Sequence, residues 1–229
     1  KVRAVREYGA NVVLHGDTYD DAASHASEIA RETGLSVIHP YDDPEVIAGQ
    51  GTVGMEILNE HEGRIHAVFV PVGGGGLIAG IGAYIKHRSP EIKVIGVEAQ
   101  GSDCLRAAMS SGRRVRLPAE GLDLFADGVS VAQIGKEPFR IARRCVDEVI
   151  VANTDEICAA IKDIFDDTRS IAEPAGALAV AGMKKYVERG KPKTGAMVAI
   201  VSGANVNFDR LRHISERAEV GEHHEAVFG

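Results

Sequence analysis

Four consecutive glycines at residues 73–76 (Gly73, Gly74, Gly75 and Gly76) are the residues whose spacing most clearly points to chemistry. They follow an apolar run at residues 67–72 and precede an apolar stretch that begins at Leu77. Glycine has no Cβ atom and readily takes positive φ, so the N–H groups of such a loop can turn toward one small object. If a helix begins at Leu77, its free N–H groups and the positive end of its dipole point to the same place. This arrangement is typical of a phosphate-binding site.

The residues leave the kind of phosphate ligand open. Residues 74–79 match the loose G-x-G-x-x-A form of a dinucleotide fingerprint, and Glu98 follows about 20 residues later, where a ribose-binding acid is expected. That fingerprint does not need Gly73. A plain flexible turn is disfavoured, because ordering four glycines costs roughly 1 kcal/mol each relative to alanine.

Two further residues lie at the ends of predicted elements, where ligands often bind. Ser202 follows a predicted strand, and Glu173 opens a predicted helix. Ser202 follows the apolar run at residues 197–201 but lies outside a G-x-S-x-G elbow, so a nucleophilic role is disfavoured. A turn cap and a hydroxyl aimed at a bound ring both remain open for Ser202. Glu173 opens a predicted helix, where first-turn electrostatics and an active-site role are both consistent. Because ligands bind at the carboxyl ends of parallel strands, we expect the glycines, Glu98 and Ser202 to share one edge.

Short runs rich in valine and isoleucine, without polar alternation, predict strands buried on both faces of a parallel sheet. These runs are residues 12–14, 37–38, 68–72, 94–97, 149–151 and 197–201. Helical patterns lie between them, so the sequence predicts an α/β fold with parallel sheets, flanking helices and right-handed crossovers.

Three helices are predicted together with the residues that begin or end them. They are residues 17–33 (Asp17 as N-cap, Gly34 past the end), residues 156–168 (Asn153 paired with Glu156), and a helix bracketed by Pro174 and Gly190. Residues 38–44 hold two prolines and predict a loop or hinge, and residues 113–127 predict an irregular surface excursion.

Composition excludes several classes of partner. The 229 residues carry a net charge of -7 with no basic block, so nucleic acid and anionic membranes are poor partners. The longest apolar or small stretch, residues 175–183, is far shorter than the about 20 residues that cross a bilayer. Cys104, Cys145 and Cys158 are widely spaced, which predicts free thiols and a cytoplasmic location.

Residues 70–77, Val-Pro-Val-Gly-Gly-Gly-Gly-Leu, resemble the phosphate loop of pyridoxal-phosphate (PLP) enzymes of the tryptophan-synthase-β-like fold, PLP fold type II. More narrowly, the chain resembles the biosynthetic threonine dehydratase family over essentially its whole length. The other matching stretches are residues 46–52 (VIAGQGT), 172–179 (AEPAGALA), 181–186 (AGMKKY), 202–208 (SGANVNF) and 214–217 (ISER).

The resemblance implies two lobes, with residues 1–43 finishing the smaller lobe and residues 44–229 forming most of the larger, cofactor-binding one. It also implies roles for six residues, in which backbone N–H groups bind the PLP phosphate and a hydroxyl bonds the pyridine nitrogen. These residues are Gly73, Gly74, Gly75, Gly76 and Leu77 for the phosphate, and Ser202 for the nitrogen. A neutral hydroxyl can donate to an unprotonated ring nitrogen, which suits β-elimination from a hydroxy amino acid.

The implied reaction converts L-threonine to 2-oxobutanoate and ammonia, the first step of isoleucine biosynthesis, in a homo-tetramer. L-serine dehydration is a related alternative. A nucleotide-binding oxidoreductase domain and a non-catalytic remnant are the alternatives from other classes.

Three features of the family do not occur in this sequence. The Ser-x-Lys-x-Arg-Gly-Ala motif, which carries the Schiff-base lysine, and the Ser-x-Gly-Asn-His-Ala loop are not present, and neither is the regulatory domain that binds isoleucine and valine. We therefore expect an N-terminally incomplete catalytic domain that is inactive alone, with its catalytic lysine outside this chain. A cation site at residues 98–103 is also disfavoured, because the loop offers few oxygen ligands.

Overall fold

The computed structural model describes residues 2–16, 19–190 and 194–222, in two compact units, Lys1–His39 and Pro40–Gly229. The first unit contains helices α1 (Val2–Glu7) and α2 (Tyr19–Thr33). Gly34 follows α2 with a φ of 74°, so the predicted glycine stop is confirmed. The predicted N-cap, Asp17, lies outside the described residues.

Two of the predicted strands are wrong. Residues 12–14 and 37–38 form no strand, and Val13 and Ile38 are 63% and 78% exposed. A strand is stable only when neighbours satisfy its backbone hydrogen bonds, and within the described residues neither run pairs with another. Local apolar character alone therefore did not make these segments β-structure.

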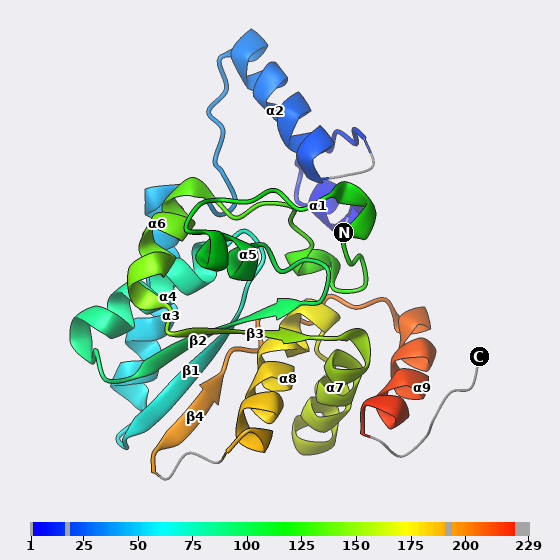
Figure 1. The fold of residues 1–229 in the computed structure, drawn as a ribbon. Coiled ribbons are helices and arrows are strands. Elements are labelled where there is room, and N and C mark those ends of the chain that lie inside the picture. Colours follow the sequence, from blue (N-terminus) through cyan, green and yellow to red (C-terminus); the bar gives the residue numbers. More distant parts are fainter. Residues whose placement is uncertain (1, 17–18, 191–193, 223–229) are drawn as a thin grey trace. The chain divides into compact units, whose positions relative to one another are not determined.

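The second unit is built on a parallel four-stranded sheet (Figure 1). Its strands are β1 (Ile65–Pro71), β2 (Lys93–Ala99), β3 (Glu148–Ala152) and β4 (Ala196–Ala199), in the order β3-β2-β1-β4. The pairs β1·β2, β1·β4 and β2·β3 are all parallel. The carboxyl ends of all four strands therefore lie at one edge, as predicted.

Helices cover both faces of this sheet (Figure 1). Helices α3, α4, α5 and α6 pack on one face, and α7, α8 and α9 pack on the other. They are Pro44–Glu60, Gly76–Arg88, Cys104–Ser111 and Lys136–Cys145, then Thr154–Thr168, Pro174–Glu188 and Leu211–Gly221. Short 3-10 turns lie at Ala119–Gly121, Asp127–Val129 and Phe208–Arg210. Along β1, Val68 and Val70 face helices α3 to α6, whereas Ala67 and Phe69 face helices α7 to α9. The strand is therefore buried on both sides.

The predicted helix boundaries of the second unit are confirmed. The Asn153 N–H donates to Glu156 Oε2 over 2.7 Å and the Glu156 N–H donates to Asn153 Oδ1 over 2.9 Å, which makes a complete capping box for α7. Helix α8 begins at Pro174, and Gly190 follows its end with a φ of 149°. These boundaries were readable because each rests on residues a few positions apart.

Two expectations from composition can be compared with the fold. Cys104, Cys145 and Cys158 are all free thiols, and Cys158 is buried in the core as a small apolar residue. Among the described helices, none combines the length and the apolar character needed to cross a bilayer.

Candidate phosphate-binding site

The glycine loop (residues 73–76) joins β1 to α4 at the carboxyl edge of the sheet. Helix α4 begins at Gly76, one residue before the predicted start, and Gly75 takes a left-handed φ of 90°. A Cβ atom on Gly74 would lie 2.3 Å from the Tyr41 ring, and one on Gly73 would lie 2.9 Å from Val129 Cα. Both distances are too short for real Cβ contacts. The loop is therefore closely packed from outside, and glycine is required for its shape as well as its flexibility.

The carbonyl groups of the glycine loop are held by the protein. The Gly73 carbonyl accepts from Cys104 Sγ over 3.5 Å, the Gly74 carbonyl from the Gly135 N–H over 3.0 Å, and the Gly75 carbonyl from the Ala79 N–H over 3.0 Å. Each bond comes from a different helix start, since these donors belong to α5, to the residue before α6, and to α4. The loop is fixed on its carbonyl side.

The N–H groups of the glycine loop and of the first turn of α4, unlike the loop carbonyls, have no hydrogen-bond partner in the described chain. From Gly73 through Ile78, no N–H donates to any atom of the described chain. Four of these six residues are buried. Buried N–H groups without partners are rare in proteins and are expensive to leave unpaired. Together with the dipole of α4, they make this loop a candidate site for an anion such as phosphate.

Sequence reasoning missed the segment that holds this loop in place. Residues 38–44, expected as a loop or hinge, carry three side chains with defined contacts. The Tyr41 ring packs on Gly74, and the Asp42 carboxylate accepts from the N–H groups of Lys136 and Glu137, each over 2.8 Å. Asp43 caps α3. An aspartate pair directly before a proline is a signal for a helix start, but the contacts of Tyr41 and Asp42 are long-range and leave no local signal.

Ser202 lies at the same edge of the sheet as the glycine loop. Strand β4 pairs with β1, and the Ile200 N–H continues the ladder by donating to the Phe69 carbonyl over 3.0 Å. Ser202 follows two residues later and is exposed. The predicted placement of the loop and Ser202 at one edge of the sheet is therefore confirmed, whereas the role of each residue stays a proposal.

Glu173 lies beside Gly203, the residue that follows Ser202. Its N–H donates to the Gly203 carbonyl over 3.0 Å, and a Cβ atom on Gly203 would lie 2.1 Å from Glu173 Oε1. No hydrogen bond or ion pair connects the Glu173 carboxylate to the rest of the described chain. The side chain therefore does not cap α8, although it opens that helix.

Glu98 is not a ribose-binding acid. Its side chain is fully buried, and its two oxygens accept from the N–H groups of Leu105 and Arg106 over 2.7 and 2.8 Å. Burial raises its pKa to about 8, although these two backbone bonds act in the opposite direction. Both oxygens bind the start of α5, so Glu98 does not provide the ribose-binding acid that a dinucleotide site requires. In the part of the chain described, no cluster of three acidic, histidine or cysteine residues suits a metal ion either.

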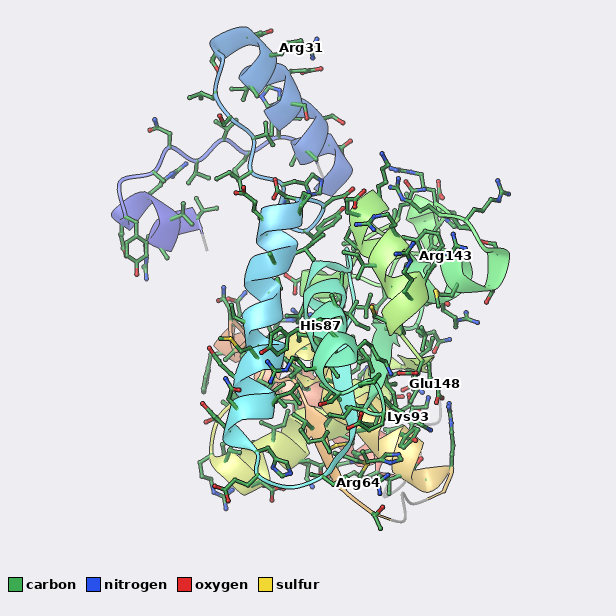
Figure 2. The ribbon with its side chains drawn as sticks, turned by 90° about the vertical axis from the view of Figure 1, so that its left-hand side faces the viewer. Arg31, Arg64, His87, Lys93, Arg143 and Glu148 are labelled. Atoms are coloured by element: carbon green, nitrogen blue, oxygen red, sulfur yellow. The ribbon has the colours of Figure 1, made fainter. Side chains whose placement is uncertain are left out.

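Most lysine ammonium groups are bound elsewhere. Lys93 is the first residue of β2 and lies at the amino edge of the sheet. Arg64, just before β1, and Glu148, the first residue of β3, lie at the same edge (Figure 2). Five of the six described lysines bind an oxygen through Nζ: Lys86 with Asp147, Lys93 with Tyr186, Lys162 with Glu222, Lys184 with Asp163 and Lys185 with Glu156. The sixth, Lys136, is exposed.

The anion site agrees with a comparison to known protein families. Residues 1–203 match the family described as pyridoxal-phosphate dependent enzyme. The chain belongs to the pyridoxal-phosphate dependent enzymes. The glycine loop fits the cofactor of this family, because its buried, unpaired N–H groups are donors suited to a phosphate group.

Within the pyridoxal-phosphate dependent family, the chain is similar to threonine dehydratases. The chain is 54% identical to the biosynthetic L-threonine dehydratase of Burkholderia multivorans over its whole length, which is 45% of that relative. It is 55% identical to the mitochondrial threonine dehydratase of Saccharomyces cerevisiae, over 97% of the chain and 39% of the relative. The chain thus spans less than half the length of these curated relatives.

Solved structures confirm the predicted fold, a parallel sheet with flanking helices as in PLP fold type II. The processed form of threonine deaminase isoform 2 from Solanum lycopersicum superposes with a TM-score of 0.91 at 45% identity, over 96% of this chain and 60% of that one. Maize serine racemase superposes with a TM-score of 0.83 at 28% identity, over 98% and 68%. Neither of these two structures supports the nucleotide-binding oxidoreductase alternative.

Proposed function

We propose that the protein containing this chain is a PLP-dependent ammonia-lyase that converts L-threonine to 2-oxobutanoate and ammonia. The observation that carries the proposal is the glycine loop, whose carbonyls are bound by the protein and whose N–H groups are not. We infer the substrate, L-threonine, from the threonine dehydratases that resemble the chain along nearly its whole length. This reaction is the first step of isoleucine biosynthesis.

Each site residue has a defined task in this proposal. The N–H groups of Gly73, Gly74, Gly75, Gly76 and Leu77 bind the phosphate of the cofactor, and the dipole of α4 adds to their attraction. The Ser202 hydroxyl donates a hydrogen bond to the pyridine nitrogen. When bound, PLP supplies an electron sink that acidifies the Cα–H bond of the amino acid.

A hydroxyl at position 202 limits the strength of that sink. Serine is neutral and does not hold a proton on the ring nitrogen, whereas a carboxylate would. A hydroxyl at position 202 would therefore suit loss of the β-hydroxyl group from the substrate. The same chemistry applies to L-serine, which is the second substrate we propose to test.

The experiment is a Ser202→Ala substitution in the full-length protein, with 2-oxobutanoate measured from L-threonine and pyruvate from L-serine. We expect kcat to fall by about tenfold or more, because the ring nitrogen loses its hydrogen-bond donor. Ser215→Ala is the matched control, since Ser215 is exposed on α9, away from the strand ends. An unsubstituted protein that forms neither keto acid would contradict the proposal.

Three further expectations belong to the same proposal. The chain of residues 1–229 alone is inactive, because its catalytic lysine lies in another segment of the protein. The complete enzyme is a homo-tetramer regulated by isoleucine and valine, which gel filtration and inhibition assays would test. The three free thiols of this chain fit a reducing compartment such as the cytoplasm.

A further inference from the structure

A buried carboxyl group behind the glycine loop fixes the start of a helix. Glu98, at the end of β2, accepts hydrogen bonds from the N–H groups of Leu105 and Arg106 over 2.7 and 2.8 Å. These groups belong to the first turn of α5, which has no side-chain cap of its own. Removing the carboxyl would leave two N–H groups unpaired, so Glu98 determines where α5 begins.

The first residue of α5 contacts the glycine loop. Cys104 is fully buried, and its Sγ donates to the Gly73 carbonyl over 3.5 Å. Burial, followed by the nearby Glu98 carboxyl, raises the pKa of the Cys104 thiol far above its ordinary value. The thiol therefore keeps its proton at neutral pH and remains a donor to Gly73.

The direction of the Gly73 carbonyl sets the direction of the next N–H. In a trans peptide unit, the C=O of one residue and the N–H of the next point in opposite directions. A Gly73 carbonyl held toward Cys104 thus turns the Gly74 N–H away from α5. Because this peptide lies between two glycines, its rotation costs little unless a contact from outside prevents it.

We propose that Cys104 and Glu98 are positioning residues for the phosphate of the cofactor. Glu98 fixes the start of α5, Cys104 at that start holds the Gly73 carbonyl, and the Gly74 N–H is thereby directed toward the phosphate. The inference rests on the proposed function only for the identity of the ligand.

The test compares Cys104→Ala with Cys158→Ala in the full-length protein. Cys158 is also a fully buried thiol, but it lies in α7 on the opposite face of the sheet. Dissociation constants are measured for PLP and for pyridoxal, which lacks the phosphate. We expect Cys104→Ala to weaken PLP by about threefold to tenfold, the effect of one hydrogen bond, and to leave pyridoxal unchanged. Cys158→Ala should change neither constant.

A second variant separates the hydrogen bond from packing. Cys104→Ser restores a donor at this position and should recover part of the lost PLP affinity. The ³¹P resonance of bound PLP should shift in Cys104→Ala and return toward its original position in Cys104→Ser. Equal effects of Cys104→Ala on PLP and pyridoxal, or equal effects of Cys104→Ala and Cys158→Ala, would overturn the inference. Failure of the proposed function would appear differently, as an unsubstituted protein that does not bind PLP.

Discussion

The Tyr41 ring lies directly against Gly74, so close that a Cβ atom on that glycine would lie 2.3 Å from two ring atoms and 2.4 Å from a third. The ring therefore closes one side of the glycine loop. A Cβ atom on Gly76 would also lie 3.0 Å from Tyr41. The shape of the loop depends on a side chain more than thirty positions earlier in the sequence.

Gly74→Ala should weaken both folding and cofactor binding. The added methyl group overlaps the Tyr41 ring, and overpacking of this kind costs about 1–3 kcal/mol of unfolding free energy. Urea unfolding and PLP titration measure the two effects. Gly49→Ala is the control, because Gly49 lies in α3 and an added Cβ atom would meet no side chain or neighbouring element within 4 Å. Replacing glycine in a helix interior there should stabilise the protein by about 0.5–1 kcal/mol. Equal loss in both variants would contradict the packing explanation.

Asn153→Ala should lower the unfolding free energy by about 0.5–2 kcal/mol, because it removes half of the capping box that begins α7. Thermal and urea unfolding give the measurement. Asn59→Ala, at an exposed position near the end of α3, should change stability by less than about 0.5 kcal/mol. A neutral Asn153→Ala variant would show that packing alone holds this helix.

Stability should fall as pH rises, through the titration of Glu98. Its pKa is about 8 in the folded protein and 4.5 in its ordinary state, so the folded chain keeps a proton that the unfolded chain releases. This contribution is complete below the unfolded pKa and is lost as pH rises through the folded pKa. Asp103 and Arg106, which lie near Glu98, act in opposite directions on its titration.

Urea unfolding between about pH 5 and about pH 8 measures this slope. Glu98→Gln should flatten it, whereas Glu60→Gln, at an exposed end of α3, should not. An unchanged slope in Glu98→Gln would mean that the carboxyl is ionised in the folded protein.

The chain of residues 1–229 should form no stable covalent bond with PLP. Five of its described lysines bind other oxygens, and Lys136 is exposed. Borohydride reduction in the presence of PLP, followed by mass spectrometry, should give no site-specific lysine adduct. An adduct at Lys136 that disappears in Lys136→Ala would contradict the expectation that the catalytic lysine lies elsewhere.

Short-range signals were enough to predict much of this fold. The pairing of Asn153 with Glu156, and the glycine loop between β1 and α4, each involve neighbours in the sequence. The shared edge of the glycine loop and Ser202 also followed, because parallel strands place their carboxyl ends together.

Long-range contacts explain what sequence reasoning did not predict. Glu98 was misread because its partners, the N–H groups of Leu105 and Arg106, depend on where α5 begins. Asp42 was missed because it binds Lys136 and Glu137, more than ninety positions away. The apolar run at residues 12–14 gave a false strand, since the sequence does not say whether a neighbour pairs with it.

Carboxyl groups of the protein already bind three of the four helix starts that meet this part of the fold, and one of the three is Glu98 at the start of α5. Asp43 binds the start of α3, and Asp42 binds the start of α6, so both positive poles are matched by protein charge. The start of α4 has no side-chain cap. Of these four helix starts, only that of α4 is left without a bound carboxyl group, so its N–H groups remain for an anion. Because Asp42 and Asp43 place carboxylates at the neighbouring helix starts, we expect the α4 start to bind one phosphate group rather than an extended polyphosphate.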